Sequence, residues 1–165
     1  MTEKFEIARV FAAPRQRVWD AWTKPEQLGR WLTPPGAKAE VKHFELTPGG
    51  YLHTKMIAPD GSVSWGKNSY REIDPPRRLV WEQGFSNEAG DIVQAPFPMP
   101  WPRTMLTTIL FDDAGEDTRV MLSWEPINPS KEELESFAQM LSSMTGGWTG
   151  TFDQLDAFLG EGATD

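Results

Sequence analysis

The fold is decided by the C-terminal stretch from Ser130 to Leu159, which reads SKEELESFAQMLSSMTGGWTGTFDQLDAFL. Ser130 and Glu133, three residues apart, form a capping box, which marks the start of a helix. After it, apolar side chains recur at helical spacing: Leu134, Phe137, Leu141, Met144, Trp148, Phe152, Leu155 and Leu159. We therefore predict one helix of about 30 residues, about 45 Å long at 1.5 Å per residue, which must lie across a whole sheet.

Two adjacent glycines, Gly146 and Gly147, lie in the middle of this predicted helix. Each costs about 1 kcal/mol there relative to alanine. One interpretation is a kink, or a close approach of a strand to the helix. The other is that the missing side chains leave room for a ligand.

Upstream of this helix, turn sequences recur at short intervals and separate runs with β character. Strands joined by short turns pair as antiparallel neighbours. Pro and Gly supply the backbone angles that such turns require. We predict strands over residues 5–11, 37–46, 51–58, 63–73, 78–85, 104–111 and 118–124.

Two short helices are expected after the first strand, because Pro14 and Pro25 each suit a first helical turn. Their inward faces would carry Val18, Trp19 and Trp22, then Leu28, Trp31 and Leu32, with a stop at 33–36. The predicted fold class is therefore α+β: a curved antiparallel sheet of about seven strands, two short helices at one end, and a long C-terminal helix in its grip. We expect residues 1–165 to form a single domain.

Composition narrows the function classes. The chain has no cysteine, which excludes disulfides, thiolate nucleophiles and cysteine metal sites. Its formal net charge of −8 argues against nucleic acid and against an anionic membrane surface as partners. No apolar run is long enough for membrane insertion, and the first ten residues do not resemble a signal peptide. We therefore expect a cytoplasmic protein.

Several local motifs follow one another in an order that resembles a known superfamily. They are FAAP (11–14), VWDAW (18–22), PEQL (25–28) with Trp31, PGG (48–50), EIDPPRRLV (72–80), and Gly147-Trp148 before Leu155. Together they resemble the START-like, or SRPBCC, superfamily of helix-grip proteins, which includes the birch pollen allergen. Within it, the chain is similar to the C-terminal domain of Aha-type activators of the heat-shock chaperone ATPase.

This resemblance implies a cavity between the sheet and the long helix. Members of the superfamily include lipid carriers, hormone receptors, polyketide cyclases and chaperone activators, so the fold does not choose among functions. The resemblance to the Aha-type activators covers only their C-terminal domain. We expect no separate N-terminal chaperone-binding domain within 165 residues, which argues against a chaperone partner.

The side chains that carry most catalytic chemistry are scarce. The only histidines, His43 and His53, fall on strand faces that look solvated, so we expect surface positions and no metal site or cofactor. Most carboxylates fall in turns. The plausible polar groups of a sheet-lined cavity are Lys67, Asn68, Tyr70, Glu82, Gln83 and Arg103. Among them, Glu82, Tyr70 and Arg103 are weak candidates for an acid–base role.

Aromatic residues are plentiful, with 8 Trp and 9 Phe against 2 Tyr. They can form a large core or line a cavity. Our first hypothesis is a cavity that binds a hydrophobic or amphipathic small molecule. The alternatives are a cofactor-free cyclase or hydrolase that uses the same cavity, and a protein-binding module; a homodimer is left open. The predicted ligand-binding residues are Trp65, Trp81, Phe85, Phe97, Trp101, Met105, Trp124, Phe137, Met140, Met144 and Trp148.

The segment 91–103 alternates four prolines with Ala95, Phe97, Met99 and Trp101. This spacing excludes a helix and a central strand and favours an extended segment. It is either a rigid strap packed on the core or a stiff flap whose apolar side chains close the mouth of the cavity, with a half-solvated Trp101 at the rim.

Overall fold

The computed structural model describes residues 4–32, 36–96 and 98–162, and it confirms the predicted α+β class. Seven strands are formed: β1 (Phe5–Phe11), β2 (Lys38–Phe44), β3 (Tyr51–Ile57), β4 (Val63–Asp74), β5 (Arg78–Ser86), β6 (Met105–Ala114) and β7 (Asp117–Pro126). Four helices accompany them: α1 (Arg15–Thr23), α2 (Pro25–Trp31), α3 (Lys131–Gln139) and α4 (Leu141–Gly162).

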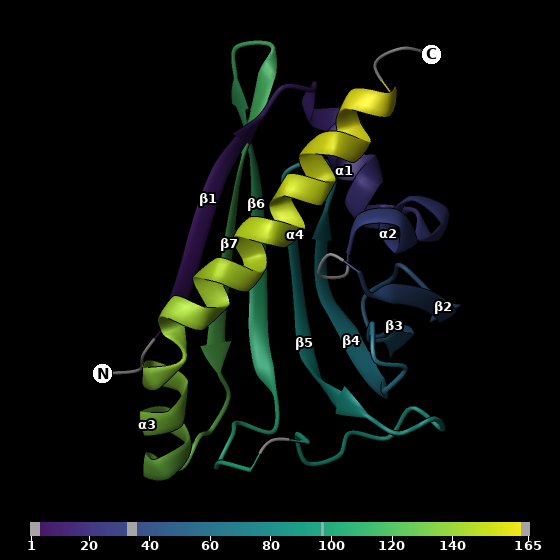
Figure 1. Cartoon of the computed structure of the whole chain (residues 1–165). Coiled ribbons are helices and arrows are strands. Elements are labelled where there is room, and N and C mark those ends of the chain that lie inside the picture. Colours follow the sequence, from purple (N-terminus) through teal and green to yellow (C-terminus); the bar gives the residue numbers. More distant parts are fainter. Residues whose placement is uncertain (1–3, 33–35, 97, 163–165) are drawn as a thin grey trace.

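The strands form one antiparallel sheet in the order β1-β7-β6-β5-β4-β3-β2. Consecutive strands from β2 to β7 are neighbours, and β1 joins the far edge beside β7. The sheet is curved, and α4 crosses its inner face on a diagonal (Figure 1). The helix-grip arrangement expected from the sequence is therefore present.

Helices α1 and α2 fill one end of the inner face (Figure 1). Pro14 is the N-cap of α1 and Pro25 opens α2, as predicted. The rings of Trp22 and Trp31 pack edge to face with centroids 4.6 Å apart, and the Trp31 indole donates to the Ala21 carbonyl at 3.0 Å. Because both rings are at most 1% exposed, this end of the molecule is a solid aromatic core.

The predicted single C-terminal helix is wrong in one respect: it is divided into α3 and α4. The capping box at its start is present, with the Glu133 N–H donating to the Ser130 hydroxyl at 3.1 Å. The division falls at Met140, whose φ of −96° and ψ of 2° leave the helical region. The apolar stripe continues across this point, so periodicity alone did not reveal the break.

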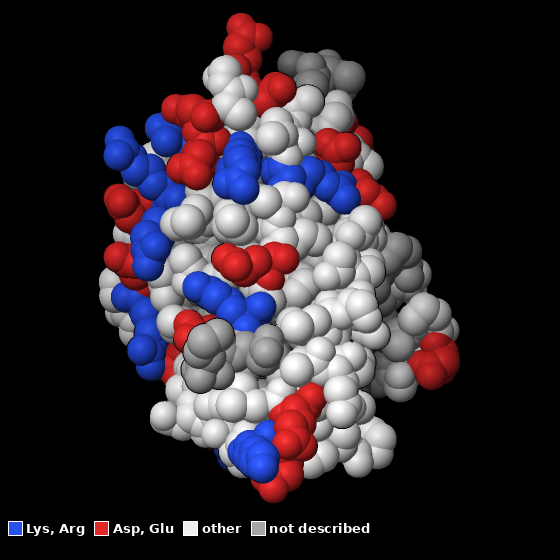
Figure 2. All heavy atoms as spheres, turned by 90° about the vertical axis from the view of Figure 1, so that its left-hand side faces the viewer, with Lys and Arg blue, Asp and Glu red and all other residues white. Residues whose placement is uncertain are grey.

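Figure 2 shows the molecule from the β1 side. Charged side chains of both signs gather toward its top and its left, with further groups near the centre and at the base, and the area just right of the centre is largely uncharged. The stretch of α4 from Leu141 to Phe152 likewise contains no charged residue. Within the described residues, no helix is long and apolar enough to cross a membrane.

Candidate functional site

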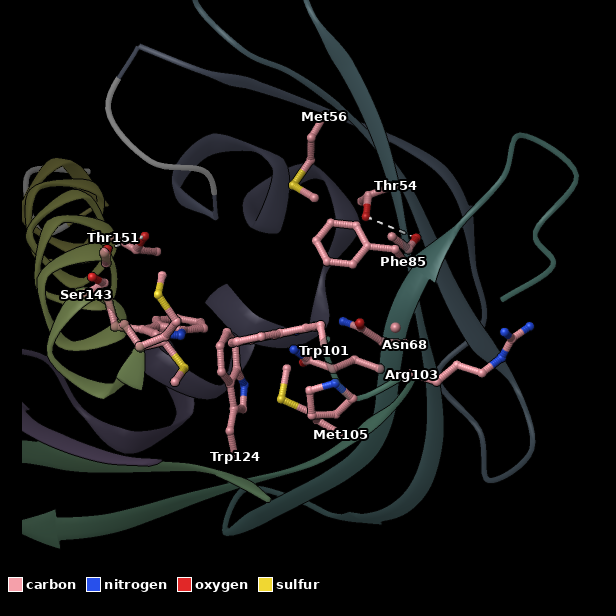
Figure 3. A pocket seen from close by; sticks show the side chains of 18 of the residues that line it. Thr54, Met56, Asn68, Phe85, Trp101, Arg103, Met105, Trp124, Ser143 and Thr151 are labelled. Atoms are coloured by element: carbon pink, nitrogen blue, oxygen red, sulfur yellow. Dashed lines mark hydrogen bonds between the residues drawn. The ribbon is translucent and has the colours of Figure 1, made fainter. Parts of the chain in front are cut away.

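A cavity of about 480 Å³ lies between the first half of α4 and the inner face of the sheet (Figure 3). Its walls come from strands β3 to β7, from α4, and from the segment between β5 and β6. Most of the lining is apolar. The lining residues are Leu32, Thr54, Met56, Gly66, Asn68, Trp81, Gln83, Gly84, Phe85, Pro98, Met99, Trp101, Pro102, Arg103, Met105, Trp124, Met140, Ser143, Met144, Gly147, Trp148 and Thr151.

Helix α4 supplies one wall through residues at helical spacing. Met144, Gly147, Trp148 and Thr151 recur at intervals of three and four and so share one face. A Cβ atom added to Gly146 or Gly147 would meet no atom within 4 Å. Within the described residues no strand approaches these glycines closely and the helix continues through them, so the interpretation that they leave open space is favoured.

The sheet supplies the opposite wall through the alternation of its strands. Asn68 on β4 and Gln83 on β5 are register partners, so their side chains leave the same face of the sheet. Trp81 and Phe85, two residues to either side of Gln83, share that face. Figure 3 shows Asn68 and Phe85 directed toward α4.

The polar groups of the cavity are few and mostly neutral. The Oε1 atom of Gln83 accepts two hydrogen bonds, from Trp81 Nε1 at 2.9 Å and from Thr107 Oγ1 at 2.7 Å. The Thr54 hydroxyl donates to the Gly66 carbonyl at 3.4 Å. The Trp124 indole nitrogen is buried and has no hydrogen-bond partner among the described residues.

Eight of the predicted ligand-binding residues come together around this cavity: Trp81, Phe85, Trp101, Met105, Trp124, Met140, Met144 and Trp148. Phe137 does not line it, because its ring is fully buried in α3 and packs against Trp101 at 5.9 Å. Phe97 lies outside the described residues. Of the polar groups expected in a sheet-lined cavity, Asn68, Gln83 and Arg103 line it, whereas Lys67, Glu82 and Tyr70 do not.

Trp65 does not line the cavity either, because it leaves the outer face of the sheet. It is an odd number of residues from Asn68 on the same strand, and its ring stacks on His53 at 5.1 Å. The expectation of a surface position for His53 is wrong, since it is only 6% exposed and its Nε2 lies 3.1 Å from the Asn87 carbonyl. His43 is exposed as predicted. Within 4–32, 36–96 and 98–162, no three His, Asp or Glu side chains are placed to hold a metal ion.

The three weak acid–base candidates are not brought together. Glu82 accepts from Arg71 Nε at 2.8 Å and is absent from the cavity lining. Tyr70 is buried in the core, and burial raises the pKa of its phenol above the ordinary value. Arg103 borders the cavity, but its guanidinium donates to the Ile92 carbonyl at 2.7 Å and points away from the cavity in Figure 3.

The proline-rich segment combines features of both earlier interpretations. Pro98, Met99, Trp101 and Pro102 border the cavity. Trp101 is nevertheless only 6% exposed and belongs to the core cluster, so the half-solvated rim ring is not found. The described part of the segment therefore contributes to the cavity wall, with Trp101 packed on the core.

Together, the curved sheet, the crossing helix and the cavity between them define a helix-grip protein of the SRPBCC type. More specifically, the chain belongs to the family described as activator of Hsp90 ATPase homolog 1-like protein, whose model matches residues 12–160. No curated protein matches the chain.

Solved structures share the fold over nearly the whole chain. A protein from Arthrobacter aurescens is 30% identical with a TM-score of 0.79, and the match covers 96% of this chain and 86% of that one. Protein Ms6760 from Mycobacterium smegmatis is 26% identical with a TM-score of 0.78, over 96% and 91% of the two chains. The AHSA1 protein from Silicibacter pomeroyi, 15% identical with a TM-score of 0.72 over 96% and 98% of the two chains, shares the fold.

Proposed function

We propose that this protein binds a hydrophobic or amphipathic small molecule in the cavity between α4 and the sheet. The observation that carries the proposal is the cavity itself, about 480 Å³ of unfilled space lined mainly by apolar side chains. That volume falls in the range of about 300–1,000 Å³ that is usual for small-molecule sites.

The burial of apolar ligand surface in this cavity can supply enough free energy for binding. Burial of apolar surface contributes about 25 cal/mol per Å². A ligand that buries about 300 Å² therefore gains about 7 kcal/mol before the costs of association. The sulfur atoms of Met56, Met99, Met140 and Met144, all partly buried, add adaptable contacts for an apolar body.

Two other functions receive less support from the described residues. An acid–base reaction needs paired ionisable groups, and Arg103 is the only ionisable residue among those that line the cavity. A protein-binding module favours a filled interior and a contiguous exposed apolar patch. The interior is hollow here, and the exposed large apolar side chains, Val10 and Val63, belong to β1 and β4, which are not neighbours in the sheet.

The two glycines of α4 provide a test with a matched control. Gly147→Leu places a side chain in the cavity, whereas Gly146→Leu, one position away, adds the same side chain where nothing lines the cavity. Both variants gain helix propensity, about 0.8 kcal/mol relative to glycine, so neither is expected to lose stability.

The measurement is fluorescence titration with N-phenyl-1-naphthylamine, an uncharged apolar dye. We expect the wild type and Gly146→Leu to bind the dye with similar affinity and Gly147→Leu to bind it at least tenfold more weakly. Equal binding by all three proteins would contradict the proposal, as would a wild type that does not bind the dye. Native mass spectrometry of the protein purified from its own source would then search for a co-purified molecule.

A further inference from the structure

Two neutral amides stand side by side on the sheet wall of the cavity. Asn68 and Gln83 are register partners on β4 and β5, and both line the cavity. Apolar surface surrounds them, including Trp81, Phe85 and Met105. Polar groups that interrupt an otherwise apolar pocket usually fix the orientation of its ligand.

The orientation of the Gln83 amide is set by its neighbours. An indole N–H can only donate a hydrogen bond, so the Gln83 atom that lies 2.9 Å from Trp81 Nε1 must be the oxygen. The same oxygen accepts from the Thr107 hydroxyl at 2.7 Å, and Thr107 is fully buried. Both lone pairs of Oε1 are therefore used, and the amide cannot rotate without losing two bonds.

The consequence falls on the other end of the same amide. With the oxygen held, the Nε2 group presents two N–H donors, and the described residues offer it no acceptor. The Nε2 atom is not one of the fully buried polar atoms that lack a hydrogen-bond partner, so it retains some accessible surface. The side chain of Asn68 likewise makes no hydrogen bond within the described residues, and Figure 3 shows it directed into the cavity.

Within the part of the chain that the structure describes, no charged group faces these two amides. Among the described lining residues there is no Asp, Glu, Lys or His, and the Arg103 guanidinium is turned toward Ile92. A charged ligand group would lose its hydration here without gaining an opposite charge. A neutral acceptor loses less and gains a donor that is already oriented.

We propose that the ligand is an uncharged, mainly apolar molecule with a carbonyl-type oxygen, and that Gln83 recognises this oxygen by donating from Nε2, with Asn68 beside it. This inference rests on the proposed binding function and specifies its ligand class. A pure hydrocarbon of the same shape buries the Gln83 donors without giving them a partner. The free-energy cost of burying a donor without a partner is larger than the net gain from a typical hydrogen bond. Gln83 is thus a specificity-determining residue.

Two molecules of nearly equal shape provide the test: benzophenone, which has a ketone oxygen, and diphenylmethane, which lacks it. Isothermal titration calorimetry measures the affinity of each for the protein. We expect the wild type to bind benzophenone about tenfold more tightly than diphenylmethane, which corresponds to about 1.4 kcal/mol.

The decisive variant is Gln83→Glu. A carboxylate still accepts from Trp81 and Thr107, and these donors favour its ionised form, but its second oxygen cannot donate to the ketone. We expect the preference for benzophenone over diphenylmethane to fall from about tenfold to equality or below. Gln94→Glu adds the same charge at an exposed residue outside the cavity and should leave the preference at about tenfold.

A second measurement does not depend on any variant. In a proton–nitrogen correlation spectrum, benzophenone should shift the side-chain amide signal of Gln83 downfield, and diphenylmethane should not. The signal is assigned by its absence in Gln83→Glu.

The outcomes separate this inference from the binding function on which it rests. If diphenylmethane binds and benzophenone binds no more tightly, the cavity binds apolar molecules and the role of Gln83 is wrong. A preference that persists in Gln83→Glu likewise overturns that role. If neither molecule binds the wild type, both the binding function and the ligand class fail.

Discussion

The two halves of α4 face the same sheet but meet it differently. In the second half, Phe152, Leu155 and Leu159 are at most 3% exposed and pack into the core. In the first half, Met144 and Trp148 are only partly buried, and they border the cavity together with Gly147. One continuous helix therefore has a packed half and a hollow half.

The two halves differ in the side chains that α4 presents and in the side chains that the elements opposite α4 present. At the packed half, α1 and α2 bring Trp22 and Trp31 onto the inner face of the sheet. At the hollow half α4 faces the sheet across the cavity, and α4 offers Ser143 and Gly147 where the packed half offers phenylalanine and leucine. The cavity thus arises from side chains that are small or missing, while the backbone of the helix continues unchanged.

The largest expected effect is the loss of a ring from the packed half. Phe152→Ala should lower the free energy of unfolding by about 3–5 kcal/mol, because its buried ring packs edge to face on Phe11 at 5.4 Å and on Trp148 at 5.6 Å. Urea unfolding followed by circular dichroism measures this loss. A loss below 1 kcal/mol would show that the two halves of α4 do not differ in packing.

A smaller loss is expected at the boundary between the halves. Trp148 contacts Trp124 at 5.6 Å and Trp22 at 6.3 Å, but part of its ring borders the cavity. Trp148→Ala should therefore cost about 2 kcal/mol, less than the 3–5 kcal/mol usual for a fully buried ring. The same urea titration compares it with Phe152→Ala, and an equal or larger loss at Trp148 would place this residue in the packed half.

Alkaline pH tests the core beside the cavity wall. Burial raises the pKa of Tyr70, so the unfolded state loses this proton first, near pH 10. Stability from this group is complete below pH 10 and falls above it by about 1.4 kcal/mol per pH unit. Between pH 9 and pH 11, Tyr70→Phe should lose about 1.4 kcal/mol less than the wild type in urea unfolding. Equal losses would mean that the phenol is solvated in the native protein.

The smallest expected effect is a gain. Gly147→Ala adds one methyl group in open space within a helix, so it should raise the free energy of unfolding by about 0.5–1 kcal/mol. The matched substitution Gly146→Ala should give a similar gain. A loss of stability at either position would contradict the open space found around these glycines.

The element order could be predicted from the sequence because each signal was local. Turn residues separated the strands, prolines opened the two short helices, and the Ser130 capping box began the C-terminal helical region. The break at Met140 could not be predicted in this way. The sequence around Met140 contains no proline or glycine that would mark a break. Gly146 and Gly147, which do suggest a break, lie inside an unbroken helix.

The candidate site was predictable in most of its apolar lining and in the polar residues Asn68 and Gln83, but not in the face that each strand presents. Trp81 and Trp124 line the cavity as predicted, but which face of a strand points inward depends on its register with its neighbours. Trp65, for example, faces outward because it lies three residues from Asn68 on β4, with no bulge between them. The burial of His53 depends on Asn87 from a distant turn, a tertiary contact that no local pattern reports.

Four of the eight tryptophans, Trp81, Trp101, Trp124 and Trp148, border the cavity. Intrinsic tryptophan fluorescence can therefore report whether the cavity is occupied. A molecule bound in the cavity would change the surroundings of these four indoles and therefore the wavelength and intensity of their emission. Screening for the natural ligand therefore requires neither a label nor a competing dye.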